Sequence, residues 1–196
     1  MVTSLAYPSL FYTVVLSTSY WLWIAFEIWL VVRERGNANA VSQDRGSRNL
    51  LIVCWSIGVV LGIFTIPYVL PQFTMHTRAV AAGIALVWAG IALRIWAIQT
   101  LGNFFTTHVI VRQGQRLITS GPYQYLRNPG YAGTLMAFLG FGVAIGNWIS
   151  LITLLAFGWV PHIVRTAVEE RALAAQFGQE YAEYRQRTWS LIPFIW

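Results

Sequence analysis

Long apolar runs dominate this chain and constrain its fold more than any other feature. A helix needs about 20 mostly apolar residues to cross the hydrocarbon core of a bilayer. Three runs have that length: 10–32, which contains Glu27, then 50–70, and then 79–98, which contains Arg94. Only 10% of the residues are charged, whereas a soluble domain carries about 25%. The chain is therefore predicted to be an all-α integral membrane protein.

A fourth apolar region extends from Tyr131 to Val164 and contains a strong turn signal, the pair Gly146-Asn147. We interpret this region as a short helical hairpin. The prediction is then a single membrane domain over residues 1–196 with five transmembrane helices. These spans are 10–32, 50–70, 79–98, 131–146 and 148–164, and the polar segments 99–130 and 165–196 flank the hairpin.

The distribution of basic residues predicts how the chain crosses the membrane. All 13 basic residues are Arg, and only Arg78 lies between the second and third spans. The others lie at or after the ends of the first, third and fifth spans, so the positive-inside rule places the N-terminus outside and the C-terminus in the cytoplasm. The chain has no signal-peptide pattern, and we expect the first span to be retained. These Arg residues form no single basic patch, which argues against nucleic-acid binding.

An antiparallel hairpin should bring the residues before Tyr131 and after Val164 together at the cytoplasmic surface. We therefore expect one pocket with Arg127, Asn128, Arg165 and Glu169, in which Arg165 and Glu169 share a helix face. Pro129 suits a first helical turn, whose free backbone amides would favour an anionic group. Two simpler interpretations stay open, because Arg near span ends commonly snorkels and because Arg165 and Glu169 could form a purely structural ion pair.

The sequence offers no candidate metal site and no soluble-type nucleotide motif. The three histidines, His76, His108 and His162, are scattered along the chain, whereas zinc requires three or four converging ligands. Glycine-rich phosphate loops and the G-x-G-x-x-G pattern are missing from the sequence.

The C-terminal half resembles the isoprenylcysteine carboxyl methyltransferase family, in the order and spacing of its motifs. The stretch from Arg127 to Gly133, Arg-Asn-Pro-Gly-Tyr-Ala-Gly, corresponds to the family's Arg-His-Pro-x-Tyr block, with Asn128 where the family usually has His. The pair Glu169-Glu170 follows the hydrophobic hairpin, as in the family. The remaining matching stretches are Phe105–Ile110, Leu117–Tyr123, Phe177–Tyr184 and Ile192–Ile195.

This resemblance implies an S-adenosylmethionine-dependent methyltransferase that acts on the carboxylate of a lipophilic acceptor, such as a prenylated cysteine, entering from the bilayer. It implies that Arg165 faces the acceptor, that Glu169 balances the positive charge of the cofactor, and that Arg127 belongs to the catalytic group. By motif, the cofactor-binding residues are His108, Val111, Arg116, Leu117, Ile118, Tyr123, Asn128, Pro129, Gly130, Tyr131 and Glu169.

Three alternative functions remain from the sequence. Phospholipid N-methyltransferases share the Arg-His-Pro and Glu-Glu pattern, and NADPH-dependent sterol-type reductases have a similar body and C-terminal run. The third alternative is not an enzyme: it is a membrane protein that binds or scaffolds other molecules without catalytic activity. The Phe-Thr-Thr-His-Val-Ile segment at 105–110 and the Phe-Ile ending at 194–195 favour the carboxyl methyltransferase.

Overall fold

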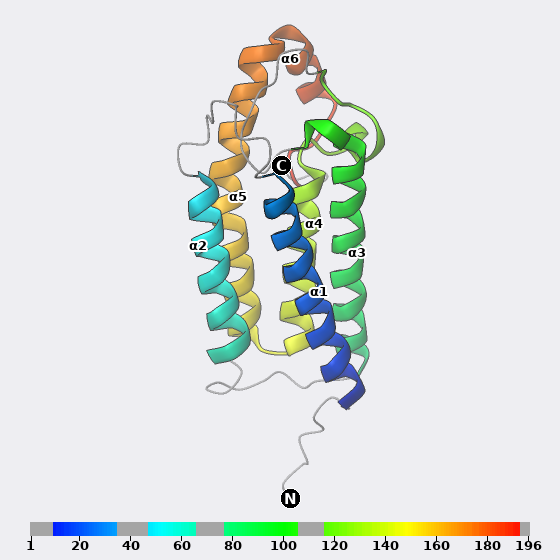
Figure 1. Ribbon diagram of the computed structural model, residues 1–196, viewed down its shortest axis with the longest axis vertical. Coiled ribbons are helices and arrows are strands. Elements are labelled where there is room, and N and C mark those ends of the chain that lie inside the picture. Colours follow the sequence, from blue (N-terminus) through cyan, green and yellow to red (C-terminus); the bar gives the residue numbers. More distant parts are fainter. Residues whose placement is uncertain (1–9, 35–46, 66–76, 106–115, 193–196) are drawn as a thin grey trace, which may run out of the picture.

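The computed structural model describes residues 10–34, 47–65, 77–105 and 116–192. Five helices run side by side along the long axis and alternate in direction, and a sixth lies across one end (Figure 1). In chain order they are α1 (Leu10–Glu34), α2 (Ser47–Val59, continued by a π-helical turn over Val60–Thr65), α3 (Thr77–Leu101), α4 (Pro129–Ile145), α5 (Trp148–Phe177) and α6 (Gln179–Gln186).

Helices α1, α3 and α5 are long and apolar enough to cross a membrane, over Leu10–Leu30, Thr77–Leu101 and Trp148–Phe177. The apolar parts of α2 and α4 are shorter, at Leu50–Gly62 and Pro129–Ile145. Each of the five predicted ranges thus contains a helix. The fifth helix does not end at Val164, because no Gly or Pro follows until Gly178 and residues such as Ala, Leu, Glu and Arg continue it to Phe177.

The predicted turn between α4 and α5 is present, and local chemistry accounts for it. Gly146 has a φ of 73°, the left-handed conformation that ends a helix and that glycine adopts without strain. The side chain of Asn147 then caps α5, because its Oδ1 accepts hydrogen bonds from the amides of Ile149 at 2.9 Å and Ser150 at 3.1 Å.

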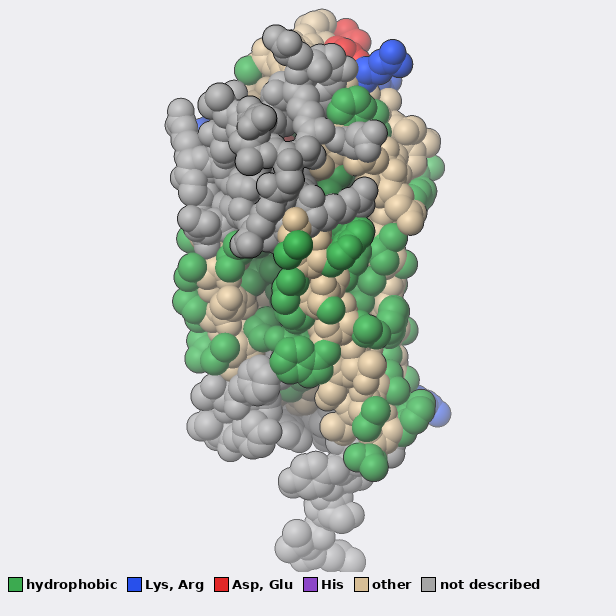
Figure 2. Space-filling model, viewed as in Figure 1, with side chains coloured by type: hydrophobic (Ala, Val, Ile, Leu, Met, Phe, Trp, Pro, Cys, Tyr) green, Lys and Arg blue, Asp and Glu red, His purple; other side chains and the backbone are tan. Residues whose placement is uncertain are grey.

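The core of the bundle is aromatic and lies where α1, α3, α4 and α5 meet. Trp23 is only 3% exposed and stacks on Phe141, with ring centroids 5.7 Å apart. It also meets Phe138 edge to face at 5.1 Å. On the face drawn in Figure 2, apolar side chains are frequent over the middle of the bundle, whereas most of the acidic and basic side chains in view lie at the end with α6. An apolar exterior of this kind is what a bilayer requires.

Helices α3 and α4 approach so closely that their backbones touch. Added at Gly90, a Cβ atom would collide with the carbonyl oxygen of Gly133, and one at Gly140 would lie 2.6 Å from the carbonyl oxygen of Gly83. The two contacts are seven residues apart on each helix. This small-residue seam fixes α3 and α4 as an antiparallel pair.

Candidate active site

The antiparallel hairpin of α4 and α5 brings three predicted site residues together at the end of the bundle where α6 lies. Nε of Arg165 donates to the hydroxyl oxygen of Tyr131 at 2.7 Å and to Oε1 of Glu169 at 3.0 Å. The Tyr131 hydroxyl in turn donates to the same Oε1. We call Tyr131, Arg165 and Glu169 the charged triad.

Burial differs between the two charged members of the charged triad. The Arg165 side chain is 4% exposed, whereas that of Glu169 is 23% exposed. Arg165 is therefore held rigidly inside the protein, while the Glu169 carboxylate can meet a ligand. The hydroxyl of Tyr123 is close enough to Glu169 to be affected by its negative charge. Burial, and then this charge, raise the pKa of the Tyr123 hydroxyl.

A buried histidine, His162, lies against Tyr131 of the charged triad; from the sequence, its role was weighed only as that of a metal ligand. The ring of His162 is fully buried, with Trp55 stacked at 5.5 Å and Tyr131 edge-on at 4.7 Å. Nδ1 lies 2.6 Å from the carbonyl oxygen of Gly158; since a carbonyl oxygen only accepts, Nδ1 carries the hydrogen. Within the described residues, Nε2 of His162 and Oγ1 of Thr166 have no hydrogen-bond partner. The interior beside the charged triad thus contains polar atoms that a ligand or water could satisfy.

A second polar cluster holds the C-terminal tail against the residues that precede α4. Nε of Arg127 donates to Oε1 of Glu170 at 2.9 Å, and its Nη1 donates to the carbonyl oxygens of Arg185 at 3.2 Å and of Thr188. The Ser190 hydroxyl donates to the same Glu170 oxygen at 3.1 Å. We call this group the tail clamp.

Asn128 is a member of the tail clamp as well. Its Nδ2 lies 3.3 Å from both the carbonyl oxygen and Oγ of Ser190, and its backbone amide donates to the Ser190 carbonyl at 3.0 Å. The amide side chain at this position therefore binds the tail of its own chain. The hydroxyl of Tyr184 adds a bond to the Tyr123 carbonyl at 2.8 Å, and burial raises the pKa of Tyr184 to about 12.

These contacts correct two expectations from the sequence. Arg127 and Asn128 contact Glu170 and the tail, rather than sharing contacts with Arg165 and Glu169, because Glu170 points to a different side of α5 from Glu169. The first-turn amides of Tyr131 and Ala132 both donate to the Asn128 carbonyl at 3.1 Å, so these two amides are not available to an anion.

The structure places the other predicted cofactor-binding residues in different surroundings. Pro129 is buried and Gly130 partly buried, in the first turn of α4. Arg116 is exposed, whereas Leu117 and Ile118 are partly buried on the segment leading to Tyr123. His108 and Val111 lie outside the residues that the structure describes.

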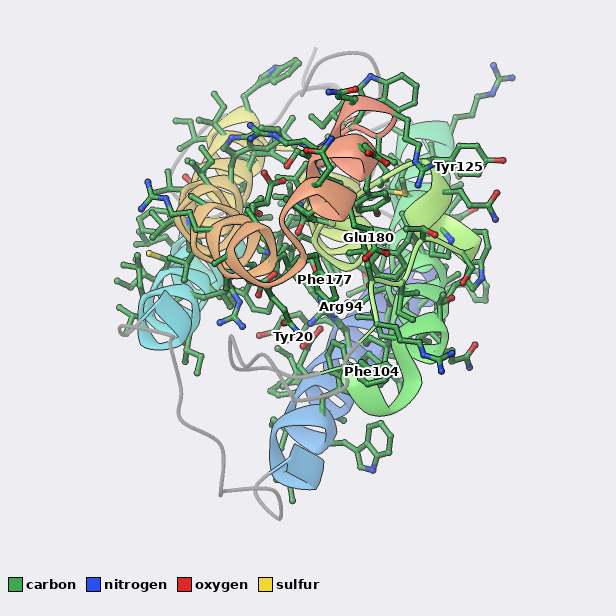
Figure 3. The ribbon with its side chains drawn as sticks, turned by 90° about the horizontal axis from the view of Figure 1, so that it is seen from above. Tyr20, Arg94, Phe104, Tyr125, Phe177 and Glu180 are labelled. Atoms are coloured by element: carbon green, nitrogen blue, oxygen red, sulfur yellow. The ribbon has the colours of Figure 1, made fainter. Side chains whose placement is uncertain are left out.

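An ion pair that was not expected from the sequence joins α1 to this site. Nε of Arg94 lies 2.6 Å from Oε1 of Glu27, and Nη2 of Arg94 donates to Oε2 at 2.8 Å. Nη1 of Arg94 donates to the carbonyl oxygen of Gly130 at 3.2 Å, and Figure 3 shows Arg94 pointing toward the centre of the bundle. Ionisable residues inside predicted spans are rare and usually paired, so Glu27 and Arg94 carried a signal that could have identified them.

Fold and site together define an all-α, multi-pass integral membrane protein with a charged site at one end of an antiparallel helix pair. The family model described as phospholipid methyltransferase matches residues 78–180. Since this match covers more than half of the chain, the protein belongs to the phospholipid methyltransferase family.

Curated relatives confirm the resemblance found in the motifs. Protein-S-isoprenylcysteine O-methyltransferase B of Arabidopsis thaliana is 36% identical over 127 residues, which cover 64% of this chain and 64% of the relative. The protein-S-isoprenylcysteine O-methyltransferase of Homo sapiens is 33% identical over 128 residues, which cover 64% of this chain and 45% of the relative. The chain therefore spans less than two thirds of the length of these relatives.

A solved structure supports the fold. The eukaryotic intramembrane Ras methyltransferase, an isoprenylcysteine carboxyl methyltransferase, superposes with a TM-score of 0.58 and 24% identity, over 79% of this chain and 55% of that one. The structural similarity covers 79% of this chain, which is more than the region 78–180 that the family model matches.

Proposed function

We propose that this protein is a membrane methyltransferase that transfers a methyl group from S-adenosylmethionine to the carboxylate of a lipophilic acceptor, such as a prenylated cysteine. The observation that carries the proposal is the charged triad. It places a buried guanidinium beside a partly exposed carboxylate, at the end of the antiparallel pair of α4 and α5.

The chemistry of the charged triad fits a sulfonium cofactor and an anionic acceptor. S-adenosylmethionine, when bound, would supply an activated methyl group on a positively charged sulfur. Glu169 supplies a negative charge toward that sulfur, and the aromatic ring of Tyr131 is a further surface for a cation. Residues proposed to hold the cofactor with them are His108, Val111, Arg116, Leu117, Ile118, Tyr123, Asn128, Pro129 and Gly130.

Arg165 is proposed to bind and orient the acceptor carboxylate. Its guanidinium is fixed by Tyr131 and Glu169, so it can position a carboxylate with little further loss of side-chain freedom. A carboxylate with a usual pKa of about 3.5 is already ionised at neutral pH, so the reaction needs no general base. Alignment of the reactants can supply about 7–11 kcal/mol of the barrier, and the apolar surroundings exclude water.

Arg127 is proposed to be a positioning residue. It lies in the tail clamp and holds Glu170, the neighbour of Glu169, together with the carbonyl oxygens of Arg185 and Thr188. Its effect on the reaction would then act through the backbone that carries Asn128 and the first turn of α4.

Calorimetric titration of the detergent-purified protein with S-adenosylhomocysteine tests the proposed pocket. Removal of the carboxylate in Glu169→Ala should weaken binding at least tenfold, since a charge-assisted hydrogen bond contributes about 1.5–3 kcal/mol. Glu183→Ala, on the exposed side of α6, is the matched control and should bind normally. We expect Arg127→Ala to weaken binding less than Glu169→Ala. Equal affinities of Glu169→Ala and Glu183→Ala would contradict the assignment.

Acceptor methylation tests the role of Arg165 and the choice of substrate. Prenylcysteine analogues, fatty acids and phosphatidylethanolamine would be offered with S-adenosylmethionine to the wild type and to Arg165→Gln. We expect carboxylate acceptors to be methylated, with at least a tenfold rise in KM for Arg165→Gln. Methylation of the amine of phosphatidylethanolamine alone would assign the protein to the phospholipid N-methyltransferases instead.

We also propose that the N-terminus lies outside and that the end with α6 lies in the cytoplasm. The Arg distribution supports this orientation, and charged side chains gather at the end with α6 (Figure 2). A single cysteine placed at Gln186 in a Cys54→Ser background should react with a membrane-impermeant maleimide only after the cells are broken. Labelling of intact cells would reverse the orientation.

A further inference from the structure

A groove of about 640 Å³ lies between the C-terminal half of α5 and α6. Seen from above, α6 lies beside α5 at this end of the molecule (Figure 3). Three alanines and a glycine leave room along its walls, and polar side chains border it. The lining residues are Ala167, Glu170, Arg171, Ala174, Gly178, Tyr181, Ala182, Arg185 and Gln186.

This groove is separate from the charged triad. Its α5 residues follow the spacing 167, 170, 171 and 174, which defines one face of a helix. Arg165 and Glu169 are each two residues from Ala167 and so lie on the opposite side of α5. A ligand in the groove would therefore not compete with one at the charged triad.

The charges that line the groove favour an anion. Glu170 is neutralised by Arg127, whose Nε is 2.9 Å away. Arg171 and Arg185 are exposed, and among the described residues their guanidinium groups have no ion-pair partner. The acidic residue Glu183 does not line the groove and accepts a hydrogen bond from Gln179 instead.

A buried hydroxyl gives a second, independent indication of a ligand. Tyr181 is 2% exposed and lines the groove, yet its hydroxyl has no hydrogen-bond partner among the described residues. Burial and then the Glu170 charge raise the pKa of this hydroxyl, so it remains a neutral donor. An anionic oxygen would satisfy it.

The position of the groove along α5 identifies the source of the anion. The polar headgroup layer is about 5–7 Å thick on each side of a bilayer, and a helix rises about 1.5 Å per residue. If the fifth span ends at Val164, as the sequence predicts, Ala167 lies about 4.5 Å beyond it and within this layer. Glu170 and Arg171 then lie about 9 and about 10.5 Å beyond it, just outside the layer. Arg side chains are long enough to reach back toward the headgroups.

From these observations we propose that the groove between α5 and α6 binds the phosphate of an anionic phospholipid headgroup. Arg171 and Arg185 neutralise the phosphate, the Tyr181 hydroxyl donates to it, and the alanines contact the glycerol. The carbonyl oxygen of Arg185 also accepts a hydrogen bond from Arg127, so lipid binding would stabilise the tail clamp. The proposal does not depend on enzymatic activity.

Lipid retention by the full-length protein tests this site. The protein would be exchanged into phosphatidylcholine nanodiscs with or without phosphatidylglycerol, and bound lipid counted by native mass spectrometry. The double variant Arg171→Gln/Arg185→Gln should bind phosphatidylglycerol about 25-fold more weakly, since each Arg near an anionic surface contributes about 1 kcal/mol and 1.4 kcal/mol is tenfold. Tyr181→Phe should lose about fivefold, the effect of one hydrogen bond worth about 1 kcal/mol.

Arg187→Gln is the matched control, because Arg187 is exposed just after α6 but does not line the groove. Equal retention by this control and the double variant would overturn the proposal. Displacement of the lipid by soluble glycerol phosphate at equal concentration would show that the site takes a free anion and would overturn the lipid assignment. Unchanged elution and thermal unfolding of the double variant show that any loss does not come from misfolding.

Discussion

Substitution of Gly133 by Ala is expected to destabilise the protein strongly, although it adds a single methyl group. The new Cβ would lie 2.5 Å from the carbonyl oxygen of Gly90 and 2.9 Å from the backbone nitrogen of Arg94. Neither atom belongs to a flexible side chain, so α3 and α4 would have to separate. We expect a loss of at least 1–3 kcal/mol, the usual cost of overpacking, measured by denaturant-induced unfolding in detergent micelles.

Gly130→Ala provides a matched control on the same helix. A Cβ at Gly130 would lie 3.8 Å from Nη1 of Arg94 and 3.9 Å from Cβ of Ala97, which is ordinary van der Waals contact. Since Ala is favoured over Gly in a helix by about 1 kcal/mol, this variant should be at least as stable as the wild type. If both variants unfolded at the same denaturant concentration, the close approach of α3 and α4 would be wrong.

Substitution of Glu27 by Ala is expected to destabilise the protein strongly, although it removes a single charge. The side chains of Arg94 and Glu27 are only 10% and 18% exposed. Removal of the carboxylate leaves a buried guanidinium whose remaining hydrogen bond, among the described residues, is to the carbonyl oxygen of Gly130. Breaking such a pair costs about 3–5 kcal/mol. Trp23 also loses the acceptor of its indole hydrogen bond, at 3.0 Å. Unfolding in detergent measures the change.

A double-mutant cycle separates the ion pair from other effects. Because isosteric apolar replacement of a whole buried pair is often tolerated, Glu27→Leu with Arg94→Met should be more stable than either single variant. Glu183→Ala, which removes an exposed carboxylate, should change stability by less than about 0.5 kcal/mol. Additive losses from Glu27 and Arg94 would show that the two residues do not stabilise each other.

The sequence predicts those parts of the molecule that depend on local chemistry. The helical ranges follow from runs of apolar residues, and the turn at Gly146-Asn147 from the preferences of these two residues. The proximity of Arg165 to Glu169 follows from helical spacing. Tyr131 joins them because an antiparallel hairpin brings its two open ends together.

Contacts between distant segments could not be predicted in the same way. The partner of Arg94 is Glu27, 67 positions away, and nothing in either segment specifies the pairing of α1 with α3. The tail clamp depends equally on distant pairs, such as Asn128 with Ser190. The glycines spaced by seven are visible in the chain, but which helices they bring together is decided by the packing of the whole bundle.

The tail clamp makes residues 188–190 part of the support for the start of α4. Trp189 and Ser190 accept backbone hydrogen bonds from Arg127 at 2.8 Å and Asn128 at 3.0 Å, immediately before the first turn of α4. A chain shortened before Trp189 would lose these two hydrogen bonds, and with them the support of Asn128, a residue of the proposed cofactor pocket. Residues 189 and 190 therefore act as support for the start of α4 and have to be kept in any shortened version of the protein.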